Sequence, residues 1–130
     1  MELLRQKYAD RDVAFVSMYV REPHPRERGF RDYVQHETYE QKLKYARELV
    51  DMKDVEIPVV VDTMEQRNHA ILGNLPNMAY VVDKQGVIQY ARTWLLADDV
   101  DETLARLVTA DDPTRPVEPT IKTAHLGSGI

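Results

Sequence analysis

The sequence contains no cysteine in its 130 residues. This absence excludes disulfide bonds, thiolate zinc sites and any thiol nucleophile within the chain. Long apolar runs are also missing, since none approaches the roughly 20 residues that a membrane-spanning helix needs. There is no basic excess either: the net charge is −5, and basic and acidic residues are mixed along the chain. Neither nucleic acid nor an anionic membrane is therefore an expected partner.

What remains is the composition of an ordinary globular protein, with 43% hydrophobic and 30% charged residues. From residue 111 onward, prolines and glycines predict a flexible tail over 111–130, which leaves one domain over 1–110. The first residues lack the charged region and apolar core of a signal peptide, so we expect a cytoplasmic location.

Four short apolar segments have the length of strands: 13–20, 57–61, 79–83 and 87–92. The first is apolar with almost no alternation, which predicts burial on both faces, as in a parallel sheet. Pro58 places the second at a sheet edge, because proline cannot donate to a ladder. Asp83 and Gly86 mark a hairpin turn between the last two.

Helices are expected over 2–9, from about 39 to 52, from about 62 to 72, and after a cap at Asp98. Thr38 and Gln41 form a capping box before the second helix. Asp62 or Thr63 caps the third helix. An α/β half followed by a hairpin and a closing helix is the order of a thioredoxin-like α/β fold with a mixed sheet.

Polar side chains follow the first two expected strands. Glu22 and His24 come after 13–20, Asp62 comes after 57–61, and His36 lies in the long loop between them. The carboxyl ends of parallel strands meet at one edge, so we expect Glu22, His24 and Asp62 on that edge, with His36 close by. Histidine titrates near neutrality, and a nearby carboxylate raises its proton affinity.

At these positions the sequence resembles the iodothyronine deiodinases and their bacterial redoxin relatives. Tyr19-Val-Arg-Glu-Pro-His24 is similar to the family's Tyr-Ile-Arg/Glu-Glu-Ala-His, and Gln35-His36 stands where the family has a second histidine. Pro58-Val-Val-Val-Asp-Thr-Met64 resembles its Pro-Val-Val-Val-Asp-Thr-Met. Leu75-Pro76, followed by Tyr80-Val81, resembles its Leu-Pro-Glu-Arg-Leu-Tyr-Val. Residues 1–92 follow the family pattern in order and spacing.

The resemblance implies a redoxin-type thiol or selenol oxidoreductase without a cofactor. Its partners would be a thiol reductant and a peroxide or disulfide substrate, either a small molecule or a protein. Glu22, His24 and His36 would orient substrate and move protons. The residues implied in substrate binding are Asp62, Thr63 and Pro76, and Pro76 would face the nucleophile.

Two departures from the family pattern limit this expectation. The family's nucleophile, a selenocysteine or cysteine, lies one strand and one loop before the residues that begin this chain, so we expect it upstream of Met1 together with the central strand. Ala91-Arg-Thr-Trp94 replaces a glycine-rich stretch of the deiodinase substrate pocket. A general redoxin role is therefore expected rather than a thyroid-hormone substrate.

A missing central strand would leave two strand edges without partners, at 13–20 and 79–83. Proteins normally avoid exposing such edges. We expect the chain to pair these edges directly, to form a homodimer through them, or to be poorly soluble.

Ordinary structural roles compete with the catalytic ones. Glu22 pairs with Arg21 or Arg26 in that interpretation, and the loop histidines bond to backbone. Capping accounts for Asp62 and Thr63, and Pro76 is a loop proline. His69 and His125 are expected at the surface and in the tail. The spacing of Glu22, His24 and His36 matches no short metal motif, so no metal site is expected.

Two alternatives to the enzyme remain open. The chain is a non-catalytic thioredoxin-like binding module that has lost its redox site, or an internal Met was taken as the start of a longer protein. The DNA upstream of the Met1 codon distinguishes them. An in-frame strand followed by Cys or a UGA codon supports the enzyme, and an immediate stop codon supports the binding module.

Overall fold

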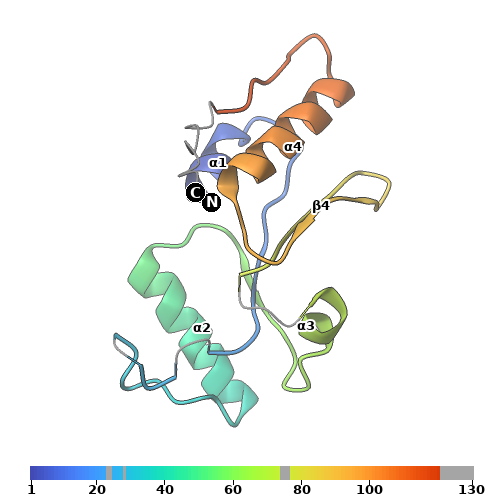
Figure 1. Cartoon of the computed structure of the whole chain (residues 1–130). Coiled ribbons are helices and arrows are strands. Elements are labelled where there is room, and N and C mark those ends of the chain that lie inside the picture. The colour runs from blue at the N-terminus through green and yellow to red at the C-terminus, as the bar shows by residue number, and fades with distance from the viewer. Residues whose placement is uncertain (23–24, 28, 74–76, 121–130) are drawn as a thin grey trace, which may run out of the picture. The chain divides into compact units, whose positions relative to one another are not determined.

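The structure is a computed structural model that describes residues 1–22, 25–27, 29–73 and 77–120. It is an α/β protein (Figure 1). Its elements, in chain order, are α1 (Glu2–Lys7), β1 (Ser17–Tyr19), α2 (Tyr39–Lys53), β2 (Val59–Val61), α3 (Arg67–Leu72), β3 (Ala79–Val82), β4 (Ile88–Arg92) and α4 (Ala97–Asp111). The chain divides into two compact units, Met1–Pro76 and Asn77–Ile130.

In the first unit, β1 and β2 pair in parallel, with Ser17 opposite Val59 and Tyr19 opposite Val61. The backbone N–H of Asp62 donates to the carbonyl of Tyr19 at 3.0 Å, so pairing continues one residue past β2. The two strands run in the same direction and end together. Residues that follow them, including Glu22 and Asp62, therefore leave the sheet at the same edge, as the sequence predicts.

Helix α2 covers this strand pair. Its predicted capping box is confirmed: the Thr38 side chain accepts from the Gln41 N–H at 3.1 Å, and the Gln41 side chain accepts from the Glu37 N–H at 2.8 Å. Tyr45 and Ala46 of α2 pack with Tyr19 of β1 to form the core of this unit. Four half-buried side chains pack against that core: Tyr33, Leu49, Val59 and Val61.

Helix α1 is fastened to the segment that leads into β2. The Glu2 carboxylate accepts the backbone N–H groups of Glu56 and Ile57, at 3.0 and 2.9 Å. Arg5 bonds to both Glu2 and Glu56. These contacts hold the start of the chain against a segment more than fifty residues further along.

The second unit is a hairpin with one long helix. Strands β3 and β4 are antiparallel with an irregularity after Val81. The Asp83 carboxylate accepts the N–H groups of Gln85 and Val87, at 3.0 and 2.9 Å, and Gly86 takes a φ of 82°. The predicted hairpin turn is therefore confirmed. Helix α4 packs on both strands, and its buried residues are Val100, Asp101, Leu104, Ala105 and Val108.

Two expectations about the sheet are wrong. The segment 13–20 is not buried on both faces: only Ser17–Tyr19 form a strand, and Val16 is 62% exposed. Within the described ranges, the four strands form two separate two-stranded sheets instead of one mixed sheet. Direct pairing of 13–20 with 79–83 is therefore not observed there.

Strand β1 begins at Ser17 instead of residue 13, and Pro58 is the physical cause. The Ser17 N–H donates to the Pro58 carbonyl at 2.9 Å. In a parallel ladder the next bond toward the amino end would run from the Pro58 nitrogen to the carbonyl of Phe15. Proline has no N–H, so the ladder stops there.

Two helix starts also differ from expectation. Helix α3 begins at Arg67 instead of near residue 62, and its cap residue is Gln66. Asp98 does not cap α4; it lies in the first turn, and the cap residue is Leu96. Asp98 and Asp99 together place negative charge at the positive end of the helix dipole, which stabilises the helix start without a side-chain cap.

Candidate active site

Polar side chains, all but one of them buried, gather at the carboxyl ends of β1 and β2. We call this group the polar edge; its members are Tyr19, Glu22, His36, Lys42, Asp62 and Thr63. All lie in the first unit, and five of them are titratable groups that are buried: Tyr19, Glu22, His36, Lys42 and Asp62.

Tyr19 and Glu22 form a buried pair. The Tyr19 hydroxyl donates to Glu22 Oε2 at 2.9 Å. Gln35 holds the Glu22 backbone on both sides, because its Oε1 accepts from the Glu22 N–H and its Nε2 donates to the Glu22 carbonyl, each at 3.1 Å. Burial, followed by the bond to the carboxylate, raises the pKa of the Tyr19 phenol well above its usual range. The carboxylate is therefore fixed in place by a hydroxyl that keeps its proton.

His36 is the second titratable group at this edge. It is 7% exposed, and its ring centre lies 6.1 Å from that of Tyr19. Its Nδ1 atom is buried and has no hydrogen-bond partner among the described residues. Burial, reinforced by the positive charge of Lys42, lowers the pKa of His36 below 6.5. The ring is therefore neutral at neutral pH and can accept a proton.

Lys42 is a member that the sequence analysis missed. Its side chain is fully buried, and its Nζ donates to the Thr63 carbonyl at 3.0 Å. Burial lowers the pKa of the Lys42 ammonium, and the charge of Asp62 partly opposes this. A signal was present in the sequence: Lys42 stands three and four residues before Tyr45 and Ala46, on the apolar face of α2.

Asp62 is engaged by backbone and side-chain donors. It is 2% exposed; Oδ1 accepts from the Thr63 N–H and from both nitrogens of Asn68, and Oδ2 accepts from the His69 N–H, at 2.9 to 3.3 Å. Burial favours the neutral acid, but these hydrogen bonds outweigh it and lower the pKa of Asp62. Asp62 thus ties the end of β2 to the start of α3.

The predicted cap residue is wrong, because α3 begins at Arg67 and its N-cap residue is Gln66. Asp62 nevertheless accepts two free N–H groups in the first turn of α3, those of Asn68 and His69. Thr63 adds a longer contact, since its Oγ1 accepts from the Arg67 N–H at 3.4 Å. The contacts observed for Asp62 and Thr63 are those of residues that stabilise the start of a helix. Their role in substrate binding stays a prediction.

His69 is not at the surface, contrary to expectation. It is 7% exposed, its Nδ1 lies 3.0 Å from Gln66 Oε1, and its Nε2 is buried without a partner among the described residues. The bond from its N–H to Asp62 fixes the turn of α3 that carries it. That bond depends on the fold, so the sequence offered no local signal for it.

Three expected residues, His24, Pro76 and His125, lie outside the described residues. Within the described ranges, no group of three acidic, histidine or cysteine side chains is arranged to hold a metal ion. Over the same ranges, every helix is too short or too polar to cross a membrane.

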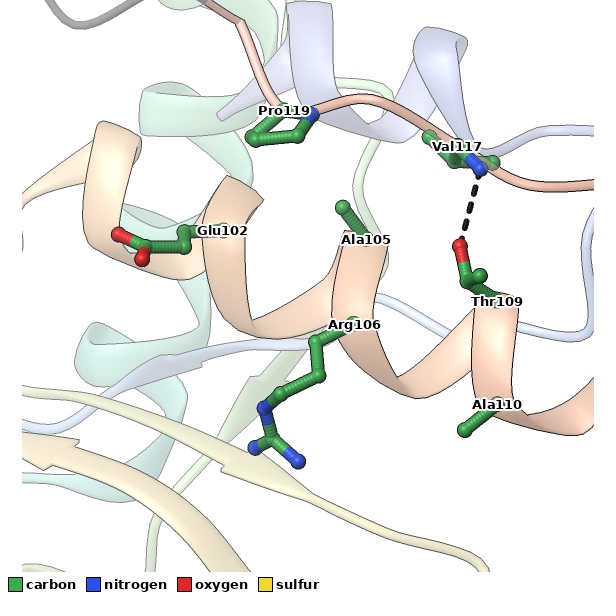
Figure 2. Close-up of a pocket in the computed structure, with 7 residues that line it drawn as sticks. All are labelled: Glu102, Ala105, Arg106, Thr109, Ala110, Val117 and Pro119. Atoms are coloured by element: carbon green, nitrogen blue, oxygen red, sulfur yellow. Dashed lines mark hydrogen bonds between the residues drawn. The ribbon is translucent and has the colours of Figure 1, made fainter.

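The second unit contains a shallow depression of about 430 Å³ between α4 and the segment after it. Figure 2 shows its lining residues: Glu102, Ala105, Arg106, Thr109, Ala110, Val117 and Pro119. The Val117 N–H donates to Thr109 Oγ1 at 3.0 Å and closes one end. No residue of the polar edge lines this depression, and its mainly apolar wall offers little for chemistry.

Fold and site together define a small α/β protein with an acid, a histidine and a lysine buried at one sheet edge. Comparison with known proteins adds no family: no protein-family model and no curated protein matches the chain.

Proposed function

We propose that this chain is part of a redoxin-type thiol or selenol oxidoreductase related to the deiodinases, with a thioredoxin-like fold. The observation that supports this best is the polar edge, where the Tyr19–Glu22 pair and a neutral His36 follow parallel strands. The order of the helices and strands also suits that fold. The substrates are peroxides or disulfides, a thiol is the reductant, and no cofactor is required.

The nucleophile in this proposal is a cysteine or selenocysteine outside these 130 residues, because the chain has no cysteine. With a peroxide, its thiolate attacks one oxygen, so an S–O bond forms as the O–O bond breaks. The leaving oxygen takes a proton. One reductant thiol then displaces water from the sulfenic acid, and a second thiol releases the enzyme thiolate as a disulfide forms.

The chain's own residues supply proton transfer and orientation. Neutral His36 can take the proton of an incoming thiol and return it to the leaving oxygen. Glu22, fixed by Tyr19, stabilises the charged ring while it carries that proton. Proton transfer by His24 and substrate contact by Asp62, Thr63 and Pro76 are further parts of this proposal.

A non-catalytic thioredoxin-like binding module is the second candidate. It is favoured by the lack of cysteine and by the full engagement of Asp62 in capping α3. Translating the DNA upstream of the Met1 codon separates the two. An in-frame strand followed by Cys or UGA supports the enzyme, and an immediate stop codon supports the binding module.

Turnover provides the direct test. We expect no protein-dependent reduction of peroxide by dithiothreitol with the purified 130-residue chain, since no thiolate or selenolate is present. In a longer product that supplies the nucleophile, His36→Gln should lower kcat roughly 100-fold or more, the usual scale for loss of acid–base catalysis. Exposed Glu37→Gln is the matched control. Turnover by the 130-residue chain, or an unchanged His36→Gln enzyme, would contradict the proposal.

The unpaired strand edges of the two sheets offer a place for a second copy of the chain to pair. Each described sheet has only two strands, so every strand is an edge strand. We propose that the isolated chain forms a homodimer through these edges or is poorly soluble, and that adding the upstream residues restores a cooperative monomer. Its mass in solution tests this, and a monomer with a sharp, reversible thermal transition would show that the edges are tolerated. The cytoplasm remains the predicted compartment.

A further inference from the structure

Two buried nitrogen atoms of the polar edge lack the hydrogen-bond partners that such groups normally have. Lys42 Nζ is fully buried but makes one hydrogen bond, to the Thr63 carbonyl, although an ammonium has three donor protons. His36 Nδ1 is buried and without a partner among the described residues. Buried polar groups are almost always hydrogen-bonded, so each exception requires a cause, such as a bound ion.

Contacts through Tyr19, Asp62 and Thr63 link His36 to Lys42, so the two nitrogen atoms belong to the same part of the polar edge. The His36 ring lies against Tyr19, at 6.1 Å between ring centres. The Tyr19 carbonyl accepts the Asp62 N–H at 3.0 Å, and the next residue, Thr63, accepts the Lys42 ammonium. The charge of Lys42 is also felt at the His36 ring, where it lowers the pKa.

The nearby carboxylates already accept hydrogen bonds from other donors. Both oxygens of Asp62 accept N–H groups from the start of α3, and Glu22 accepts the Tyr19 hydroxyl. Within the described residues, Lys42 forms no ion pair within 4 Å. Its charge is therefore compensated only at a distance, and a buried charge without a close partner is costly.

We propose that Lys42 and His36 bind the carboxylate of a small ligand, one oxygen on Lys42 Nζ and the other on His36 Nδ1–H. The single positive charge suits a monoanion, and the negative charge of Asp62 disfavours a dianion such as phosphate. A carboxylate has two oxygens, one for each of these two nitrogens, and a charged donor strengthens such a hydrogen bond. This inference does not rest on redoxin chemistry, because binding requires no nucleophile.

The first experiment follows His36 in the wild-type chain by ¹H–¹⁵N NMR during a titration with sodium formate at fixed pH and ionic strength. We expect a saturable shift toward the Nδ1–H tautomer, together with a shift of the Lys42 side-chain signals. Formamide, which has the same shape without the charge, should give no such response. Benzoate identifies the source of the group: saturation by formate alone indicates a free small acid, and saturation by both indicates the carboxylate of a larger ligand.

The second experiment uses two lysines of the same helix. Lys42→Met should weaken formate binding about tenfold or more, the effect of losing one charge-assisted hydrogen bond. Lys44→Met should leave it unchanged, because the Lys44 side chain is 70% exposed. No saturable response of the wild type to formate or benzoate, an equal response to formamide, or undiminished binding by folded Lys42→Met would overturn the proposal. The wild-type titration decides even if Lys42→Met does not fold.

Discussion

The two compact units bury different kinds of side chain. Within the described residues, the first unit buries five charged or titratable polar residues: Glu22, His36, Lys42, Asp62 and His69. The second buries one, Asp101, among five apolar residues: Val81, Val100, Leu104, Ala105 and Val108. Burying polar groups costs free energy unless each is bonded, whereas burying apolar groups stabilises the fold. Among the described residues, the interior of the first unit thus has five polar side chains beside six hydrophobic ones, whereas that of the second has one beside five.

Each unit has an aspartate whose carboxylate accepts several N–H groups, and the two aspartates differ in burial. Asp62 in the first unit accepts four N–H groups while almost fully buried. Asp83 in the second accepts three, from Gln85, Val87 and Gln89, in a turn open to water. Comparing these two carboxylates separates the effect of burial from that of hydrogen bonding.

The largest expected effect is that of Asp62→Ala. Removing this acceptor leaves several donors unsatisfied, at about 1–3 kcal/mol for each one buried, so the free energy of unfolding should fall by roughly 3 kcal/mol or more. Asp83→Ala should cost about 1 kcal/mol, because water replaces the lost acceptor. Urea unfolding followed by circular dichroism measures both. Equal losses would mean that burial does not distinguish the two sites.

Tyr19→Phe should have a smaller effect, also in the first unit. The substitution keeps the ring packing but leaves the buried Glu22 carboxylate without its hydroxyl donor, and we expect a loss of about 1–2 kcal/mol. Tyr39→Phe is the control, because Tyr39 is 42% exposed. A loss no larger than that of the control would show that water satisfies Glu22 as well as Tyr19 does.

The pH dependence of stability should trace to His36. Its pKa is lowered in the folded state, so between about pH 6.5 and the folded value the unfolded chain binds a proton that the folded chain does not. The free energy of unfolding is therefore highest above about pH 6.5, and it decreases as the pH falls from there to the folded-state pKa of His36. Asp62 adds a separate loss below its ordinary pKa of 3.8, because its pKa is also lowered.

The measurement is Tm across this window for wild type and His36→Gln. The variant should show a flatter profile between about pH 7 and pH 5, since it lacks the titrating group. His69→Gln serves as the control for a second buried histidine. If Tm changed with pH equally in wild type and His36→Gln, a group other than His36 would be responsible for the pH dependence.

The smallest effect is expected in the second unit. Trp94 is 63% exposed, so Trp94→Ala should change the free energy of unfolding by no more than about 0.5 kcal/mol. Leu104→Ala, in the apolar interior of the same unit, should cost about 2–5 kcal/mol. Denaturation by urea compares the two. A large loss at Trp94 would show that this side chain is covered in solution.

The sequence predicted the helices, the hairpin and the shared edge of Glu22 and Asp62, because these depend on local signals: a capping box, turn residues and short apolar runs. The length of β1 was missed, because it depends on the register that pairs Ser17 with Val59 and so places Pro58 where the next N–H donor of the ladder would stand. The burial of Lys42 was missed although its place on the apolar face of α2 signalled it, because its partner, the Thr63 carbonyl, lies 21 residues away. The burial of His69 was missed because its contact with Asp62 depends on where α3 begins.

The pairing of β1 with β2 has a consequence for the order of folding. Ser17 pairs with Val59, 42 residues later, whereas Val82 pairs with Ile88 across a tight turn. A hairpin closes in roughly 1–10 μs, but a parallel pair must wait for its crossover. At about 5–20 residues per second, a ribosome needs seconds to make that stretch. During that interval β1 has no partner strand, and Asp62 and Thr63 have not yet been made, so the polar edge is complete only after β2 pairs with β1.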